Sequence, residues 1–416
     1  MRILYVSMLW FGFQGLILRG EREPTGMPGF IRPLKRLLEL GHQVDMVLAA
    51  PEDSGPLNVG ADWLAPVSFE FVPWSPRGLE RMRSPLRLWR AARRALSRNA
   101  YDFIYGQENA GVLGCLAARQ AGISCGQRIY GTQYVKEILS QSRLRLLRDH
   151  PLEYLSWTTG KNFLLCTDDG SRGDLVQRQL CPNPPYGFHF WRNGIDLDFV
   201  RAADAAPIFP DPFLFFPARV VPWKNHLAGV EILRKLHALG HDSVHLLVCG
   251  QISNQVYWQR VMDEVKQSGL GAFVHHLGAL PTMSIPPYLR QAIAVLAPYE
   301  LANVSNAVIE TLAVGGVIVT LDVNNPSLAA VVQDGENGIT AASPADAGRR
   351  LAELISEPER ARALREQAAT RARDAFPWWD ERVEREMMLI QATVEQRRHR
   401  RAAPGAALGA RERSRA

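Results

Sequence analysis

The sequence has 416 residues, of which 47% are hydrophobic, and this length and composition predict two or three domains with substantial cores. The five cysteines are odd in number and form no C-x-x-C pair, which argues against a metal site and for a reducing compartment. The first residues are too short for a signal peptide core, and no long apolar run follows them. These features predict a cytoplasmic protein.

The formal charge of +6 is concentrated at the end of the chain. Residues 397–416 contain seven arginines and one acid, a formal charge of +6, so residues 1–396 are formally neutral. This tail of Ala, Gly, Pro and Arg is predicted to be disordered. It is a weak basis for a nucleic-acid or membrane partner, and we predict no nucleic-acid partner.

The first half of the chain alternates strands and helices. "RILYVSM" is predicted as a buried strand, and residues 25–50 read as a Gly-rich turn, an amphipathic helix and a second strand. Residues 101–123 repeat strand then helix, and the segments 126–135 and 162–180 continue the alternation. This order is typical of a parallel, doubly wound sheet.

The alternation stops between Cys181 and Pro212, where Pro and aromatic residues replace it, and this stretch is predicted to connect two domains. Strands and helices resume with "FLFFPARV", and a last helical region is predicted from Asp346 to Gln391. The chain is therefore predicted to form two separate α/β sheets that face each other across a cleft.

"PYELANVSNAVIETLAVGGVIVTLD", which ends at Asp322, contains a strand, a polar loop and an apolar helix with one acid, Glu310. A capping box does not explain the acid, because Ala307 stands three residues before it. Attraction to the helix N-terminus remains a partial alternative. Ligands bind where strand ends meet helix starts in such sheets, so we expect Glu310 to hold a ligand hydroxyl.

Two cations lie at the end of the predicted strand "FLFFPARV" and just after it. Arg219 belongs to the strand, and Lys224 comes five residues later. Two cations on a strand-to-helix loop suit a diphosphate, although two solvated surface charges are the simpler alternative. "TGMPGF", which contains Gly26, would let a phosphate or sugar approach the backbone. Gly250 at the end of a strand permits close approach too, or is an ordinary turn glycine.

Two further features of the sequence are weaker evidence for a function. The ten histidines show no metal-ligand spacing, so no metal site is predicted. Residues 85–100 form a basic amphipathic helix, which is an ordinary surface helix or a weak peripheral contact with anionic lipid.

With these residues in place, the chain resembles the retaining GT-B glycosyltransferases of family 4 (group 1) over about residues 1–391. "FPARVVPWKNH", "FVHHLGAL", "VVQDGENGI" and "NGIDLDFV" are similar to segments of that family. The resemblance implies two Rossmann-like domains. These are an acceptor domain at 1–195, a nucleotide-sugar domain at 196–376, and a final helix at about 377–391 that crosses back to the first domain.

The resemblance also implies roles for individual residues. Arg219 and Lys224 would hold the donor diphosphate, and Glu310 would hold the ribose hydroxyls. The donor would further contact Gly26, Gly250 and the turn formed by Val304, Ser305 and Asn306, and the acceptor side would contain Glu108, Tyr130 and Thr132.

The sequence departs from the family at two positions. The family often carries E-x7-E, but Ala302 stands eight residues before Glu310, and Glu300 comes two residues too early; we assign Glu300 to the catalytic set with Arg219 and Lys224. Tyr130 stands where many members have a histidine. The resemblance implies proton transfer to the donor phosphate itself, so neither departure excludes activity.

We therefore predict a metal-independent, hexosyltransferase-type enzyme without a cofactor. It would move a sugar from a nucleoside-diphosphate sugar to an unknown acceptor, whether a glycan, a lipid or a small-molecule natural product. A non-catalytic nucleotide-sugar-binding protein, which Ala302 and Tyr130 favour, and a GT-B epimerase or hydrolase are the alternatives. The sequence does not predict the oligomeric state.

Overall fold

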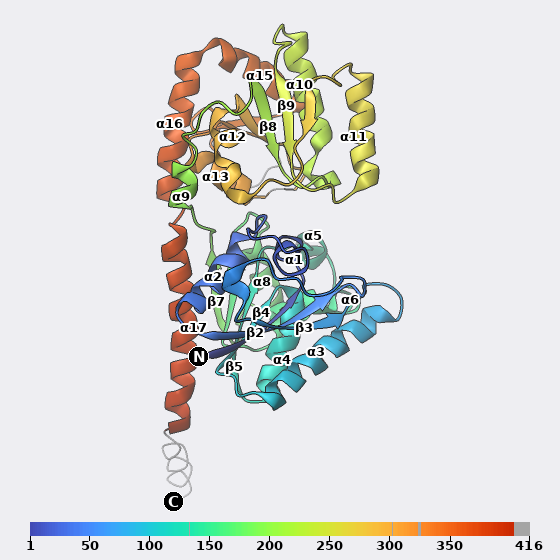
Figure 1. The fold of residues 1–416 in the computed structure, drawn as a ribbon, viewed down its shortest axis with the longest axis vertical. Helices are drawn as coiled ribbons and strands as arrows, with labels where there is room; N and C mark the ends of the chain where they lie inside the picture. Colours follow the sequence, from blue (N-terminus) through green and yellow to red (C-terminus); the bar gives the residue numbers. More distant parts are fainter. Residues whose placement is uncertain (133, 302, 323–325, 403–416) are drawn as a thin grey trace, which may run out of the picture.

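The computed structural model describes residues 1–132, 134–301, 303–322 and 326–402. Two α/β domains stand one above the other, with the N-terminal domain at the bottom of the view (Figure 1). Ala302 and the part of the predicted tail at 403–416 lie outside the described residues. Each domain is built on a sheet whose strands are all parallel, as doubly wound sheets require.

The N-terminal sheet has seven strands in the order β3-β2-β1-β4-β5-β6-β7. Its central strands are buried on both faces, which explains their nearly continuous apolar sequences. The strands are β1 (Arg2–Met8), β2 (Gln43–Ala50), β3 (Ser68–Pro73), β4 (Phe103–Gln107), β5 (Ser124–Ile129), β6 (Phe163–Thr167) and β7 (Gly187–Trp191).

Helices cover both faces of this sheet. They are α1 (Phe11–Leu18), α2 (Pro28–Glu39), α3 (Glu80–Arg98), α4 (Val112–Gln120), α5 (Val135–Ser140), α6 (Arg143–Asp149), α7 (Pro151–Thr158) and α8 (Gly173–Leu180). One core joins the sheet to α1 and α2 through residues such as Phe13, Phe30 and Leu34, and another joins it to α3 and α4 through Leu88 and Val112.

The C-terminal sheet has six strands in the order β10-β9-β8-β11-β12-β13. The strands are β8 (Phe213–Pro217), β9 (His245–Cys249), β10 (Val274–His276), β11 (Ala294–Ala297), β12 (Ile318–Leu321) and β13 (Ile339–Ala341). Its helices are α10 (His226–Ala238), α11 (Gln255–Gln267), α12 (Pro286–Gln291), α13 (Asn306–Ala313), α14 (Pro326–Ala329), α15 (Pro344–Ser356) and α16 (Pro358–Ala375). One continuous core fills this domain.

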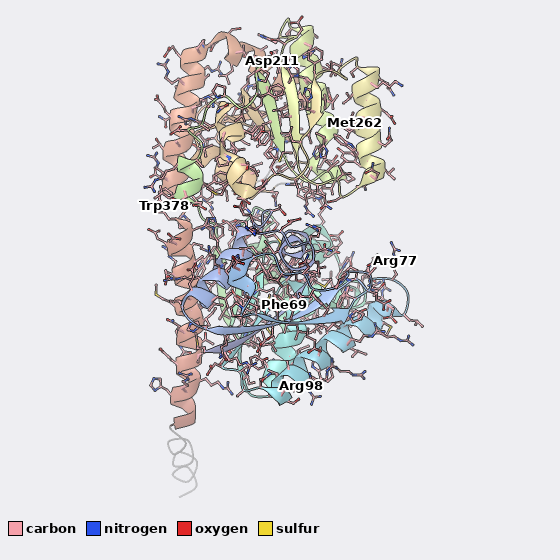
Figure 2. All side chains as sticks on the ribbon, in the orientation of Figure 1. Phe69, Arg77, Arg98, Asp211, Met262 and Trp378 are labelled. Carbon is pink, nitrogen blue, oxygen red and sulfur yellow. The ribbon has the colours of Figure 1, made fainter. Side chains whose placement is uncertain are left out.

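The chain crosses between the domains twice, and the two crossings are hydrogen-bonded to each other. The N–H of Ile195 donates to the Pro377 carbonyl at 2.9 Å, and the N–H of Trp379 donates back to Ile195 at 2.9 Å. Trp378 lies at this junction (Figure 2). The last helix, α17 (Trp379–Ala402), then packs on the N-terminal domain through Val383, Met387 and Ile390.

Three features differ from the sequence interpretation. The stretch between Cys181 and Pro212 is more than a connection, because it contains the edge strand β7 and the short helix α9 (Leu197–Arg201). Helix α1 follows β1 directly, where no helix was predicted. The last helix reaches Ala402, so residues 397–402 of the predicted disordered tail are helical.

Candidate active site

Lys224 is a buried cation at the domain interface. It is the last residue of the 3-10 turn Pro222–Lys224, which follows β8 along the chain. Its ammonium lies 3.5 Å from the centroid of the Tyr299 ring and 4.2 Å from that of Trp223. The residue is 8% exposed, and burial, followed by the neighbouring charge of Arg219, lowers the Lys224 pKa to about 7, while the Asp169 carboxylate acts in the opposite direction.

Arg219 lies on the same loop and is exposed. Gly250, at the end of β9, is required beside it: its φ is +148°, and a Cβ there would lie 2.3 Å from the Ala218 carbonyl oxygen. Close approach of two chain segments therefore explains this glycine. The N–H of Glu300 donates to the Trp223 carbonyl at 3.0 Å, which fastens the loop after β11 to this turn and leaves the Glu300 side chain exposed.

Glu310 lies in the second turn of α13. Helix α13 begins at Asn306 after the N-cap Ser305, whose side chain makes no capping hydrogen bond, so Glu310 is outside the capping register. Within the described residues its carboxylate has no hydrogen-bond or ion-pair partner. Burial raises the Glu310 pKa to about 7, and the positive charge of Arg32 on α2 opposes this rise. A buried carboxylate without such a partner can accept hydrogen bonds from a ligand.

Arg32 joins the two domains at this point. Its guanidinium forms an ion pair with Asp196, which caps α9 in the connection, and it lies 5.7 Å from the Trp379 ring centroid. Burial lowers the Arg32 pKa, while Asp380, Glu310 and Asp198 act to raise it. Arg32 of the N-terminal domain is therefore close enough to Glu310 of the C-terminal domain for each charge to affect the pKa of the other residue.

The loop before α13 is bonded to the N-terminal domain. The Val304 N–H donates to the Asp169 carbonyl at 2.5 Å, and the Asn303 side-chain amide donates to the Asp169 carboxylate at 3.2 Å. The Asn306 side chain accepts from Asn193 at 2.8 Å. A donor phosphate that used the Val304 amide would have to take the place of Asp169.

The Gly26 loop meets the C-terminal domain at Thr282. The Gly26 N–H donates to the Thr282 hydroxyl at 3.4 Å, and that hydroxyl donates to the Pro24 carbonyl at 3.1 Å. A Cβ on Gly26 would meet no atom within 4 Å, so its φ of +81°, rather than crowding, favours glycine. The structure therefore brings the predicted glycine loop to the domain interface.

The predicted acceptor-side residues are neighbours at the ends of β4 and β5. The Tyr130 N–H donates to the Glu108 carboxylate at 2.9 Å, and the Tyr130 hydroxyl donates to Gln107 at 2.6 Å. Burial raises the Glu108 pKa to about 8, and the charges of Glu153 and Asp169 add to this effect. Thr132 is bonded to Ser171 through both its N–H and its hydroxyl.

Asp169 was missed by the sequence interpretation. It follows β6, and burial raises its pKa to about 6 although Ser171 donates hydrogen bonds to it. Gly131, with a φ of +139°, makes room for it, because a Cβ there would lie 2.2 Å from an Asp169 carboxylate oxygen. Its position directly after a strand end could have indicated Asp169, because the same rule pointed to Arg219.

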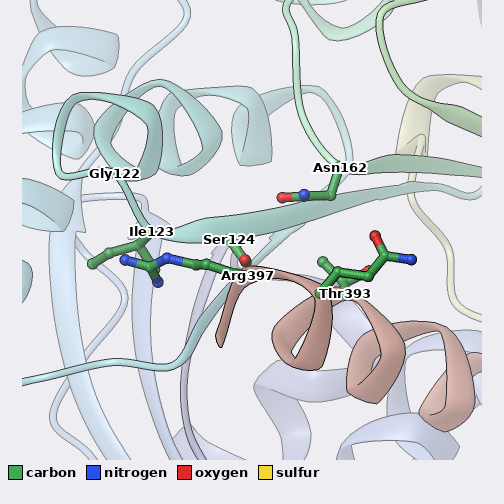
Figure 3. A pocket seen from close by; sticks show the side chains of 7 residues that line it. Gly122, Ile123, Ser124, Asn162, Thr393 and Arg397 are labelled. Atoms are coloured by element: carbon green, nitrogen blue, oxygen red, sulfur yellow. The ribbon is translucent and has the colours of Figure 1, made fainter. Parts of the chain in front are cut away.

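A hollow elsewhere in the molecule is unrelated to these residues. It has a volume of about 200 Å³ and lies where β5 begins, at the sheet edge opposite Glu108 and Tyr130 (Figure 3). Its lining consists of Gly122, Ile123, Ser124, Asn162, Thr393, Gln396 and Arg397. Among the described residues there is no group of three or more His, Cys, Asp or Glu side chains that could hold a metal ion.

Part of the chain is similar to a known protein family. Residues 205–371 match the family model described as glycosyl transferases group 1. No curated protein matches the chain significantly. Residues 205–371 are a group 1 glycosyltransferase domain. The predicted enzyme class, a glycosyltransferase, is thereby confirmed.

Solved structures resemble the chain over nearly its whole length. Sucrose-phosphate synthase from Thermosynechococcus elongatus has a TM-score of 0.67 at 16% identity, covering 97% of this chain and all of that one. A glycosyltransferase from Rickettsia africae has 0.65 at 14% identity, covering 94% and 98%. The Anabaena protein HepE, in complex with UDP and glucose, has 0.64 at 16% identity, covering 95% and 99%. At such identities the likeness concerns the fold, and the predicted GT-B fold is confirmed.

Proposed function

We propose that this glycosyltransferase moves a sugar from a nucleoside-diphosphate sugar to an acceptor with retention of the anomeric configuration. The donor would bind mainly to the C-terminal domain, and the acceptor would enter from the N-terminal domain. The observation that carries the proposal is the buried Lys224 ammonium, which is stacked on two aromatic rings beside Arg219 and has no ion pair among the described residues. A bound diphosphate would supply the anion that this cation lacks.

The reaction breaks the bond between the sugar and the diphosphate, so negative charge grows on the leaving oxygen. Lys224 and Arg219 would stabilise that charge electrostatically, and stabilisation of this kind is usually the largest single contribution to catalysis. By the resemblance, the acceptor oxygen bonds to the sugar carbon on the same face and its proton passes to the leaving phosphate. Glu300 extends from the loop that is bonded to the Lys224 turn, and it would lie beside the donor.

Glu310 would accept hydrogen bonds from the two ribose hydroxyls. Its carboxylate has no partner among the described residues and lies on a short helix behind the polar loop Asn303–Asn306. The Anabaena relative has also been solved with UDP-glucose, which supports a nucleotide sugar as the donor class here. We further propose that two cations serve in place of a metal ion, and that the enzyme works in the cytoplasm.

Product formation with a panel of UDP-, GDP-, ADP- and dTDP-sugars tests the proposal. A transferred sugar whose anomeric proton signal keeps the donor configuration supports it, and activity should survive EDTA. Donor binding without turnover across a broad acceptor panel would instead indicate the non-catalytic binding protein. Release of free sugar, or an epimerised donor, would indicate a hydrolase or an epimerase.

Substitution separates the diphosphate contact from the rest of the donor. Arg219→Ala and Lys224→Ala should each weaken nucleoside-diphosphate binding and leave nucleoside binding unchanged. Each charge-assisted contact contributes ~1.5–3 kcal/mol, so losses of roughly tenfold or more are expected. Equal losses for nucleoside and diphosphate would show that the two cations act elsewhere.

A further inference from the structure

Helices α3 and α6 expose large apolar side chains on the outside of the N-terminal domain. Met82 is 73% exposed, Leu79 just before α3 is 69% exposed, and Leu144 on α6 is 81% exposed. Six of the fourteen large apolar side chains that are exposed in the described part of the chain lie on or beside α3, α5 and α6, namely Leu79, Met82, Leu86, Leu139, Leu144 and Leu147. Scattered single residues of this kind are ordinary, but a group of six is not.

The two helices form one surface. Leu79, Met82 and Leu86 recur at intervals of three and four residues, so they lie on one face of α3, while Leu88, Ala91 and Ala95 are buried on the other face. The Arg81 guanidinium donates to the Asp149 carbonyl at 2.6 Å, which holds the start of α3 against the end of α6. We call this surface, formed by residues 77–98 and 136–149, the α3–α6 face.

The charge of this face is strongly positive. Residues 77–98 contain eight arginines and one acid, a formal charge of +7, and residues 136–149 contain four cations and two acids, a formal charge of +2. Because residues 1–396 are formally neutral, the rest of that span carries −9. Figure 2 shows Arg77 and Arg98 at the two ends of α3 on the outside of the domain. The cations are thus concentrated on the face that exposes the leucines.

We propose that the α3–α6 face docks on an anionic lipid bilayer. A bilayer surface rewards both kinds of side chain at once, because the arginines meet lipid phosphates while the leucines and Met82 enter the boundary with the acyl chains. A nucleic acid would use the arginines but would leave the apolar side chains in water. None of the described helices is long and apolar enough to cross a membrane, so the contact is peripheral.

The face adjoins the acceptor side of the candidate active site. Helix α5 begins at Val135, three residues after Thr132, and α6 follows it along the chain. In Figure 1, α5 lies at the top of the N-terminal domain, toward the C-terminal domain, and α3 runs away from it along the outer edge. Docking would therefore place the acceptor side of the interface close to the lipid surface.

Co-sedimentation of the full chain with vesicles tests the proposal. We expect binding to vesicles with about one-third phosphatidylglycerol, little binding to pure phosphatidylcholine, and weaker binding as salt rises, since surface charges are screened within ~8 Å at physiological salt. The triple substitution Leu79→Ser, Met82→Ser and Leu144→Ser should lower the partition coefficient at least tenfold. The matched control is Val256→Ser on α11, because Val256 is 83% exposed in the other domain.

Two further measurements keep the proposal falsifiable. Replacing Arg77, Arg90 and Arg143 with serine should weaken binding roughly fivefold for each cation removed, while the Arg-rich tail stays intact. Leu144→Trp should show a blue shift of its fluorescence when anionic vesicles are added. Equal binding by the wild type and both triple variants, absence of binding to anionic vesicles, or binding of a DNA duplex that the arginine substitutions abolish without any vesicle binding would overturn the proposal.

Discussion

The Lys224 ammonium lies 3.5 Å from the centroid of the Tyr299 ring, although Lys224 carries a charge that burial disfavours. Cation–π contact offsets part of the lost hydration, but it supplies no counter-charge. The ligand-free protein therefore holds a cation that readily loses its proton. A bound diphosphate would favour the charged form and raise the Lys224 pKa again.

This relationship predicts a pH dependence of donor binding. With a Lys224 pKa of about 7 in the ligand-free protein, a nucleotide sugar should bind more weakly as the pH rises above 7, by up to ~tenfold per pH unit. Calorimetry of a nucleotide sugar, whose diphosphate keeps its charge in this range, measures it. Lys224→Met should bind weakly and lose this decline above pH 7, whereas Arg219→Ala should keep the decline but begin it at a higher pH, because the charge of Arg219 lowers the Lys224 pKa. An equally steep loss of binding above pH 7 in Lys224→Met would assign the titration to another group.

The same pKa has the opposite consequence for folding. The unfolded Lys224 pKa is about 10.5, so between pH 7 and 10.5 the unfolded chain binds more protons and stability rises with pH. Below pH 7 both states are charged, and burying the ammonium opposes folding. Lys224→Met should therefore melt at a higher temperature than the wild type near pH 6, and this advantage should shrink toward pH 10. A lower melting temperature at pH 6 would contradict this account.

Asn303 tests whether the contact with Asp169 competes with the donor. Asn303→Ala removes the 3.2 Å amide–carboxylate hydrogen bond that helps hold the loop before α13 on the N-terminal domain. Because a net hydrogen bond contributes ~0.5–1.5 kcal/mol, donor binding should tighten about two- to tenfold. Fluorescence titration with a nucleotide sugar measures it, and Asn193→Ala, which removes the neighbouring bond to Asn306, is a parallel probe. Weaker donor binding by Asn303→Ala would mean that its amide contacts the donor instead.

Glu386 secures the last helix to the N-terminal domain. Its buried carboxylate accepts from Arg128 at 2.6 Å, from Arg382 at 3.0 Å and from Tyr105 at 2.5 Å. Glu386→Gln leaves two buried guanidinium groups without an anion, so unfolding should become ~3–5 kcal/mol easier. The control is Glu384→Gln on the same helix, whose exposed pair with Arg36 contributes at most about 1 kcal/mol. Urea denaturation of both variants compares them, and equal losses would show that the buried network adds little.

Local sequence patterns were enough to predict the fold, and they singled out candidate site residues at the C-terminal strand ends. Continuous apolar strands that alternate with amphipathic helices predict two parallel sheets, and the strand-end rule finds Arg219, Lys224 and Glu310. The edge strand β7 was not predicted because its residues are half-buried or exposed and contain no long apolar run. Helix α1 was not predicted because a short helix rich in phenylalanine and leucine resembles a continuation of strand β1.

Contacts between distant segments could not be predicted in this way. Asp169 and Arg32 gain their importance from the opposite domain, and no local pattern records how two domains meet. Arg382 and Glu386 look like an ordinary pair one helical turn apart, yet Arg128 on β5 makes that pair part of a buried network. The site is thus a product of tertiary placement as well as of motifs.

Glu310 offers the sharpest test of the candidate site. Above pH 7 the carboxylate is ionised and should accept hydrogen bonds from both ribose hydroxyls. Glu310→Gln keeps the shape and removes the charge, so affinity for the nucleoside diphosphate should fall roughly tenfold or more at about pH 8. The loss should shrink for a 2′,3′-dideoxy nucleotide, which lacks the partner hydroxyls. Calorimetry with both nucleotides measures the difference.

Stability distinguishes this role from a structural one. The folded Glu310 pKa of about 7 lies above the unfolded value of 4.5, so the folded state binds more protons between these values and stability falls as pH rises from 4.5 to 7. The ionised acid therefore opposes folding, and Glu310→Gln should melt at the same temperature as the wild type or slightly higher at pH 8. A strongly destabilised variant whose folded fraction binds nucleotide normally would show that the acid serves the fold, because a structural carboxylate loses its own partner when its charge is removed, whereas a ligand-binding one loses only the ribose.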